Sequence, residues 1–482
     1  MRLRIGVLLV IFISLATKGA RADSTAGETA RIARLQTRIP ELMKLATVPG
    51  LSIALIDHGR LRWLHGFGVQ DVTSGRPVDD DTIFLAASLS KCVFTYAVLE
   101  LVDQGKLALD VPLTHYLPKP YIDNDPRLNA ITARIVLSHR SGFPNWRDEG
   151  GPLLIKFNPG ERFSYSGEGI VYLQRVVEQI TGKPLDEVMQ ELVFKPLGMT
   201  SSSYLWRDAD APHIAIGHDI DGRPLPPFKA THAIAAASLN TTAKDYARFL
   251  VAVANGVGLK AATLRDMETP QIAVDPECTN CTNRIPKRLS QTVFWGLGWG
   301  IERTKKGDLL WHWGDNSVFK AFVMLDPKTR SGFVMFANGE NGLSLVGDII
   351  DIVVGGEQPA LTWLKYDRYD SPAMQLNQVA RDRGARAALS ELDDALKSGA
   401  ISEDALNGVA YRALSRKRNA DAIMLFERNV ALHPQSANVY DSLGEAYMND
   451  GQKERAIASY EQSLALNPHN DNAAKMLKKL RP

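Results

Sequence analysis

Ser88 and Lys91 have the residue types and the spacing that catalysis by a serine nucleophile needs. They stand three positions apart in Ser88-Leu89-Ser90-Lys91, at the start of an apolar-patterned helix expected to run to Gln104. On a helix, this spacing places both side chains on one face. A buried lysine with a lowered pKa can take the serine proton, and the helix N-terminus favours an oxyanion. The alternative is a simple helix cap, which is the usual role of a serine at such a position.

The segments that must position this pair combine strands with helices. Antiparallel strands are expected near both ends of the region, with the longer helices between them. This order predicts an α+β, three-layer domain over residues 23–357. The expected strands are 51–56, 61–68, 309–313, 319–325 and 332–337, and the expected later helices are 169–180 and 242–255.

The composition changes near Gln358, and the last part of the chain shows a 34-residue repeat. A linker is expected over 358–372 and an all-α repeat domain over 373–482. The pairs Ala422/Ala456, Phe426/Tyr460 and Pro434/Pro468 each lie 34 residues apart. This segment resembles tetratricopeptide repeats, clearly over 437–470 and more loosely over 403–435. The alternative is a plain helical appendage that covers apolar surface.

Five longer motifs lie in the region of Ser88: Thr82–Lys91, Leu109-Asp110, Tyr116-Leu117-Pro118, Leu137–Gly142 and Pro159–Ser166. They resemble those of the serine β-lactamase and penicillin-recognising D,D-peptidase superfamily. The resemblance covers about residues 35 to 355 and is to the class C β-lactamase branch, which includes esterases and D-amino-acid peptidases. It implies an antiparallel sheet with helices on both faces and an added helical lobe.

The resemblance implies a role for each matching residue. Ser88 matches the acylated nucleophile, Lys91 its activating lysine, and Tyr165 the tyrosine of the family's Tyr-x-Asn motif. A tyrosine normally titrates near pH 10, so as a base it needs a nearby ammonium such as that of Lys91. Core packing is the alternative for Tyr165.

The family's third motif, Lys-Thr-Gly or His-Thr-Gly, is matched by His312-Trp313-Gly314, which is expected to bind substrate. Its glycine lets a substrate backbone approach the strand. By the same analogy, the N–H groups of Ser88 and Asp315 form the oxyanion hole. No metal or cofactor is expected. His312 is mostly neutral near pH 7, and a buried strand histidine is the alternative reading.

Two positions depart from the family pattern. Gly167 replaces the asparagine whose amide holds the substrate, and Trp313 replaces a threonine hydroxyl that would bond a carboxylate. Both changes weaken the case for efficient peptide and β-lactam hydrolysis. Whether Glu168 becomes a partner of Lys91 is left open by the sequence.

The function expected from these features is acyl-enzyme hydrolysis of small esters or D-amino-acid amides. One alternative is a D,D-carboxypeptidase or β-lactamase acting on cell-wall peptides or β-lactams. A second alternative is a non-catalytic ligand sensor or scaffold, in which the repeats recruit a protein partner.

The N-terminus has the order of a secretory signal over residues 1–22. Arg2 and Arg4 precede an apolar run from Ile5 to Ala16, followed by a small-x-small site ending at Ala22. The protein is therefore expected to be exported, periplasmic or secreted. The apolar run is too short for a stable membrane span, although a short anchor is the alternative. Removing its four positive charges changes the net charge from +2 to +2 − 4 = −2, which argues against a nucleic-acid partner.

The three cysteines are too few for a disulfide framework. Cys278 and Cys281 form a lone C-x-x-C in a polar loop, for which a local disulfide is expected. Zinc is the weaker alternative because no second pair of ligands accompanies them. Cys92 lies in an apolar helix pattern and is expected in the core.

Overall fold

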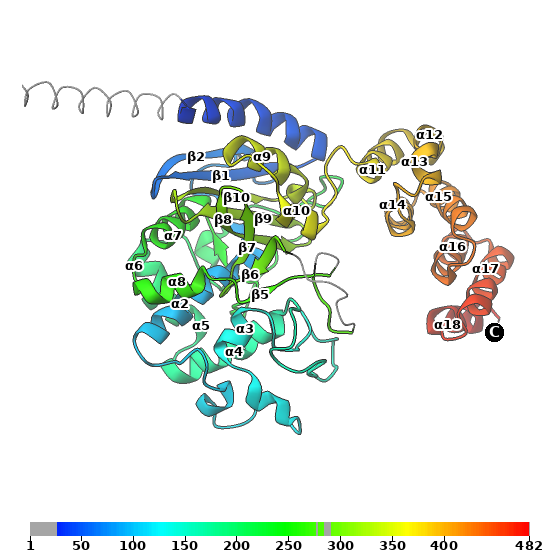
Figure 1. Ribbon diagram of the computed structural model, residues 1–482. Helices are drawn as coiled ribbons and strands as arrows, with labels where there is room; N and C mark the ends of the chain where they lie inside the picture. Colours follow the sequence, from blue (N-terminus) through cyan, green and yellow to red (C-terminus); the bar gives the residue numbers. More distant parts are fainter. Residues whose placement is uncertain (1–26, 276–277, 284–290, 482) are drawn as a thin grey trace, which may run out of the picture. The chain divides into compact units, whose positions relative to one another are not determined.

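The computed structural model describes residues 27–275, 278–283 and 291–481, and the expected signal segment lies outside these ranges. The chain divides into two compact units, and the boundary in the sequence lies between Tyr366 and Asp367 (Figure 1). Each unit has its own apolar core, one built from residues between 54 and 336 and the other from residues between 376 and 473. Within the described ranges, no helix is long and apolar enough to cross a membrane.

The first unit is built on an eight-stranded sheet in the order β2-β1-β10-β9-β8-β7-β6-β5, with every neighbouring pair antiparallel. The five expected strands are present, and β5 to β7 were not expected from the sequence. The strands are β1 (Gly50–Asp57), β2 (Arg60–Gly68), β5 (Ile272–Ala273), β6 (Val293–Trp295), β7 (Gly300–Thr304), β8 (Gly307–Asn316), β9 (Phe319–Asp326) and β10 (Ser331–Ala337). A separate pair joins β3 (Phe84–Leu85) to β4 (Asn240–Thr241).

Helices cover both faces of this sheet (Figure 1). A helix over residues 27–46 and α9 (Val346–Val353) lie over one face, and α2 (Ser90–Asp103) and α7 (Ala243–Asn255) lie under the other. Alternate side chains of the central strands, such as Ala54 and Phe336, enter the same core as α2 and α7. This arrangement is the expected three-layer α+β architecture.

The helical lobe lies beyond α2 and contains α4 (Gly167–Thr181), which Ser166 caps through a 2.9 Å bond from the Gly169 N–H. Helix α4 ends at Gly182, whose backbone is in the left-handed conformation. The shorter helical segments of this unit are η1 (Ala87–Leu89), η2 (Leu113–Tyr116), η3 (Pro126–Ala130), α3 (Ala133–Leu137), α5 (Leu185–Met189), η4 (Gln190–Phe194), α6 (Lys195–Leu197), η5 (Asp208–His213), α8 (Ala261–Met267) and η6 (Gly342–Leu345).

The segment expected as a linker is structured in its first part. Helix α10 (Pro359–Leu364) packs onto β6 and β7, with Ala360 and Trp363 buried. The first unit therefore extends to Tyr366.

The second unit consists of antiparallel helix pairs. In the pair α16 and α17, Gly444 allows close packing, because a Cβ there would meet the Tyr460 ring at 3.0 Å. Ala422, Phe426 and Ala456, which define the sequence repeat, have no exposed surface. The helices are α11 (Pro372–Arg383), α12 (Ala385–Glu391), α13 (Asp393–Lys397), α14 (Glu403–Ser415), α15 (Asn419–Leu432), α16 (Ala437–Asn449), α17 (Lys453–Leu466) and α18 (Asp471–Leu480).

Because the two cores are separate, removing the repeats should leave the first unit folded. We expect a chain that ends before Ala373 to keep a cooperative thermal transition and the activity of the full chain, measured on the same substrate. A truncated chain that melts cooperatively but is inactive would show that the repeats complete the site.

Candidate active site

Ser88 lies in the turn η1, directly before α2, and Lys91 lies in the first turn of α2. The Nζ atom of Lys91 is 3.0 Å from Oγ of Ser88 and 2.7 Å from the carbonyl oxygen of Ala236. Ala87 has a left-handed φ of 48°, which sets the direction in which the chain enters the turn. The structure thus brings the predicted nucleophile and its predicted base into hydrogen-bond contact.

The Lys91 side chain is 1% exposed, and this burial lowers its pKa to about 7, with Cys92 acting weakly in the opposite direction. A free amine is therefore available near neutral pH to accept the Ser88 proton. Cys92 is also buried, as expected, and burial raises the pKa of its thiol, so this group stays uncharged.

Tyr165 is positioned by the backbone on both sides of it. Ser164 N–H donates to the His139 carbonyl at 2.8 Å, Tyr165 N–H to the Thr279 carbonyl at 3.0 Å, and Ser166 N–H to Nδ1 of His139 at 3.1 Å. The Nζ atom of Lys91 lies 4.9 Å from the centre of the Tyr165 ring. The predicted tyrosine is therefore at the nucleophile.

The phenol oxygen of Tyr165 is buried and has no hydrogen-bond partner of standard geometry within the described ranges. Burial raises the pKa of this phenol, and the nearby Ser88 hydroxyl offsets only part of that rise. Tyr165 is thus a neutral phenol at rest. Of the two candidate bases, only Lys91 is poised to accept a proton near pH 7.

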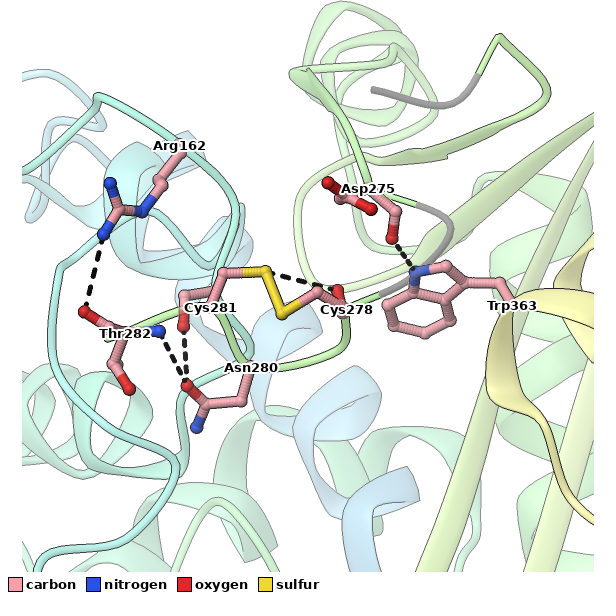
Figure 2. The surroundings of a disulfide bond; sticks show 8 residues. Arg162, Asp275, Cys278, Asn280, Cys281, Thr282 and Trp363 are labelled. Carbon is pink, nitrogen blue, oxygen red and sulfur yellow. Dashed lines mark hydrogen bonds between the residues drawn. A yellow bond between two sulfur atoms is a disulfide. The ribbon is translucent and has the colours of Figure 1, made fainter. Parts of the chain in front are cut away.

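A disulfide loop braces the Tyr165 segment from the other side. Cys278 and Cys281 are bonded to each other in the structure (Figure 2). Between them, Thr279 accepts the Tyr165 N–H, and Asn280 Oδ1 accepts the Ser164 hydroxyl at 2.9 Å. The Cys278–Cys281 disulfide therefore holds a loop that contacts the Tyr165 segment.

Gly314 lets strand β8 approach the turn that carries Ser88. A Cβ at this position would meet the Ala86 carbonyl oxygen at 2.5 Å and Ala87 Cβ at 3.3 Å. Any side chain at position 314 would separate β8 from η1, which explains why the third motif needs a glycine there.

His312 is fully buried and neutral. Its Nδ1 lies 2.7 Å from the Trp313 carbonyl, and its Nε2 is buried with no partner within the described ranges. Burial, followed by the positive charge of Lys91, lowers the pKa of His312 to about 3. Its ring lies 6.1 Å from the Tyr165 ring. His312 is expected to hold no charge that would attract a substrate carboxylate.

The tryptophans near the site belong mainly to the core. Trp295, Trp299 and Trp311 have no exposed surface, whereas Trp313 is 6% exposed and packs 4.8 Å from the Tyr165 ring. Of these four tryptophans, Trp313 is thus the one that packs against Tyr165 and is also partly exposed.

The space that the family's asparagine would use at position 167 is occupied by another segment. A Cβ on Gly167 would meet the Asn145 carbonyl oxygen at 2.8 Å and the Trp146 ring at 3.0 Å. The Asn145 side chain also accepts the Gly167 N–H at 3.0 Å. Sequence reasoning did not identify Asn145 or Trp146, because neither lies in a matched motif; the signal was only their position after Leu137–Gly142.

Glu168 does not pair with Lys91. Its carboxylate binds the Arg147 guanidinium through two bonds, at 2.9 Å and 2.7 Å, and also accepts the Arg147 N–H at 3.1 Å. The question left open by the sequence is thereby answered, and the amine of Lys91 keeps Ser88 and Ala236 as its partners.

Two family models match this chain, one in each of its two units. The β-lactamase family model matches residues 35–352, and a tetratricopeptide repeat model matches residues 437–470. Esterase EstB of Burkholderia gladioli is 30% identical over 227 residues, which are 40% of this chain and 56% of EstB. The matched region thus spans little more than half of EstB.

Two solved structures share the fold at lower identity. The octameric penicillin-binding protein homologue from Pyrococcus abyssi is 22% identical with a TM-score of 0.56, covering 73% of this chain and 81% of that one. D-alanine carboxypeptidase AmpC from Burkholderia cenocepacia is 20% identical with a TM-score of 0.55, covering 67% and 99%. With Ser88, Lys91, Tyr165 and Gly314 inside the matched range, the chain belongs to the β-lactamase family of serine hydrolases and carries a C-terminal tetratricopeptide repeat.

Proposed function

We propose that this protein hydrolyses small esters or D-amino-acid amides through an acyl-enzyme formed on Ser88. The observation that carries the proposal is the 3.0 Å contact between Ser88 Oγ and the buried amine of Lys91, whose pKa is lowered to about 7. A hydroxyl beside a buried, neutral amine is an activated nucleophile.

The reaction proceeds in two halves. The Lys91 amine takes the Ser88 proton as Oγ attacks the substrate carbonyl carbon, and the N–H groups of Ser88 and Asp315 stabilise the oxyanion. The tetrahedral intermediate collapses, and the Tyr165 hydroxyl passes the proton from Lys91 to the leaving alcohol or amine. Water then adds to the acyl carbon by the same relay, which frees the acid and restores Ser88.

Two unpartnered polar atoms support this assignment. Within the described ranges, Tyr165 Oη and His312 Nε2 are both buried without a hydrogen bond of standard geometry, although the Ser88 hydroxyl lies near the Tyr165 phenol. A buried polar atom without a partner is costly, and such atoms are often kept where a reacting group will supply the bond.

The preference for esters rests on what the site lacks. The segment with Asn145 and Trp146 occupies the place of the family's asparagine, and Trp313 offers no hydroxyl to a substrate carboxylate. An ester has a better leaving group than an amide and depends less on those contacts. The similarity to EstB, named an esterase, points the same way. D,D-carboxypeptidase or β-lactamase action is the competing outcome in the tests below.

We further propose that the protein is exported, to the periplasm or beyond, and that its repeats bind a protein partner. The secretory order of residues 1–22 supports export, and a disulfide between Cys278 and Cys281 fits an oxidising compartment. Stacked helix pairs commonly present a surface for another protein.

Replacing the nucleophile tests the mechanism. Ser88→Ala should lower kcat by about 10⁴-fold or more, because the step that forms the acyl-enzyme is lost. Intact mass after mixing with a slow ester should show an adduct on the wild type alone. Near-normal activity in Ser88→Ala would exclude this mechanism, and a wild type inactive on every substrate class would favour a ligand sensor.

The pH profile tests the base. Because the free amine of Lys91 is the active form and its pKa is about 7, kcat/KM on an uncharged ester should rise as the pH increases through about 7 and level off above it. The pKa values of His139 and His312 are lowered far below this range, so neither histidine accounts for such a rise. A profile that is flat between about pH 6 and 8 would contradict the assignment of Lys91.

Substrate ranking tests the selectivity. Losing one hydrogen bond to a charged group costs roughly 1.5–3 kcal/mol, or about ten- to a hundredfold in rate. We therefore expect kcat/KM for a short-chain ester to exceed that for a penicillin or a D-Ala-D-Ala peptide by at least that factor. A preference for the penicillin or the peptide would move the protein to the competing class.

Restoring a residue of the family pattern should reduce the difference in kcat/KM between the ester and the penicillin or peptide. The structure indicates which of the two positions to change. Gly167→Asn would drive a side chain against the Asn145 backbone at 2.8 Å, so this change displaces the loop. Trp313→Thr is the cleaner variant, provided that its melting temperature confirms a folded protein.

A further inference from the structure

Resting on the function proposed above, we propose that Tyr366 is a positioning residue of the oxyanion hole. Together with Lys320 it holds the carboxylate of Asp315, and so fixes the peptide whose N–H faces the reacting carbonyl. Tyr366 lies in the segment expected as a linker, outside every motif of the family resemblance.

The β8–β9 hairpin determines where the Asp315 N–H points. A two-residue turn joins Asn316 to Phe319, and such turns close on a hydrogen-bonded pair. Because pairs alternate, Asp315 and Lys320 form a non-hydrogen-bonded pair, and the Asp315 N–H points away from β9. On that other side, the β7 ladder ends at Trp311. The N–H is therefore open beside the turn that carries Ser88.

Both oxygens of the Asp315 carboxylate are held. Lys320, which is 6% exposed, forms an ion pair with Oδ1, and the Tyr366 hydroxyl donates to Oδ2 at 2.6 Å. Bonds to a charged acceptor are strong and directional. The side chain of Asp315 is thus held from two directions, next to the hairpin turn.

Tyr366 remains a donor at physiological pH. Burial raises the pKa of its phenol, and the Asp315 carboxylate raises it further, while Trp313 acts in the opposite direction. Tyr165 also contributes to this rise in the pKa.

Tyr366 is delivered by a fixed element and not by a free segment of chain. In helix α10, the Ala360 N–H donates to the buried Glu302 carboxylate at 3.0 Å, and the Trp363 indole N–H donates to the Asp275 carbonyl at 2.7 Å (Figure 2). Lys365 then adopts a left-handed φ of 57°, which ends the helix and turns the chain at Tyr366. The repeat unit begins at the next residue, Asp367.

The first experiment compares Tyr366→Phe with the wild type in the full chain. We expect kcat on a short-chain ester to fall about tenfold while KM changes less than about twofold, since the oxyanion forms only in the transition state. The affinity for phenylboronic acid, which forms a tetrahedral adduct with an active serine, should fall by a similar factor. Tyr116→Phe is the matched control, because its hydroxyl accepts the Ala108 N–H elsewhere in the unit.

A double-mutant cycle tests whether Tyr366 acts through Asp315. If it does, Tyr366→Phe should have no further effect on kcat in an Asp315→Ala background. A purely structural role would make the two losses multiply.

Insertions test the part played by α10. Two residues, Gly-Ser, placed between Lys365 and Tyr366 should reproduce the loss seen in Tyr366→Phe, whereas the same insertion between Tyr366 and Asp367 should leave kcat near the wild-type value. Unchanged kcat and boronate affinity in a folded Tyr366→Phe variant would overturn this inference alone. A wild type that neither hydrolyses the ester nor binds the boronic acid would overturn the proposed function and this inference with it.

Discussion

The structure of the first unit depends on the placement of the Lys91 amine. This amine must be buried beside Ser88 and must still have hydrogen-bond acceptors. Burial lowers its pKa to about 7, while a buried amine without partners would be costly. The Ala236 carbonyl supplies the second partner. Its segment is held in place because the Leu239 carbonyl accepts the Ala86 N–H and the Leu239 N–H donates to Ser90 Oγ.

A second requirement is the close approach of β8 to the nucleophile turn. Gly314 permits it, since a side chain there would meet the Ala86 carbonyl at 2.5 Å. Antiparallel pairing then leaves the Asp315 N–H unpaired on the side away from β9. The disulfide loop and α10 brace neighbouring parts of the site, and the 2.7 Å bond from Trp363 to Asp275 connects α10 to the chain that leads into the loop.

At the positions where the chain departs from the family pattern, other residues occupy the space and pair with the charges. Asn145 and Trp146 fill the space next to Gly167, and Glu168 neutralises Arg147 instead of approaching Lys91. The nucleophile and its base are therefore preserved while the contacts that would favour peptides are changed. Under the function proposed above, acyl transfer at such a site would select substrates by their leaving groups more than by a charged end.

The sequence by itself determined the parts of this protein that depend on local order: the Ser88–Lys91 spacing, the five longer strands, the helices α2, α4 and α7, and the 34-residue repeat. The helix over residues 27–46 was not predicted. Strands β5 to β7 were missed because they are only two to five residues long, so no periodicity develops, and β6 and β7 also flank a turn with Gly296 and Gly298. The Ala236 carbonyl, the Asn145 loop and Tyr366 could not be predicted, because each acts on a residue far away in the chain. Those contacts are made only when the sheet, the lobe and α10 pack together, which no local pattern encodes.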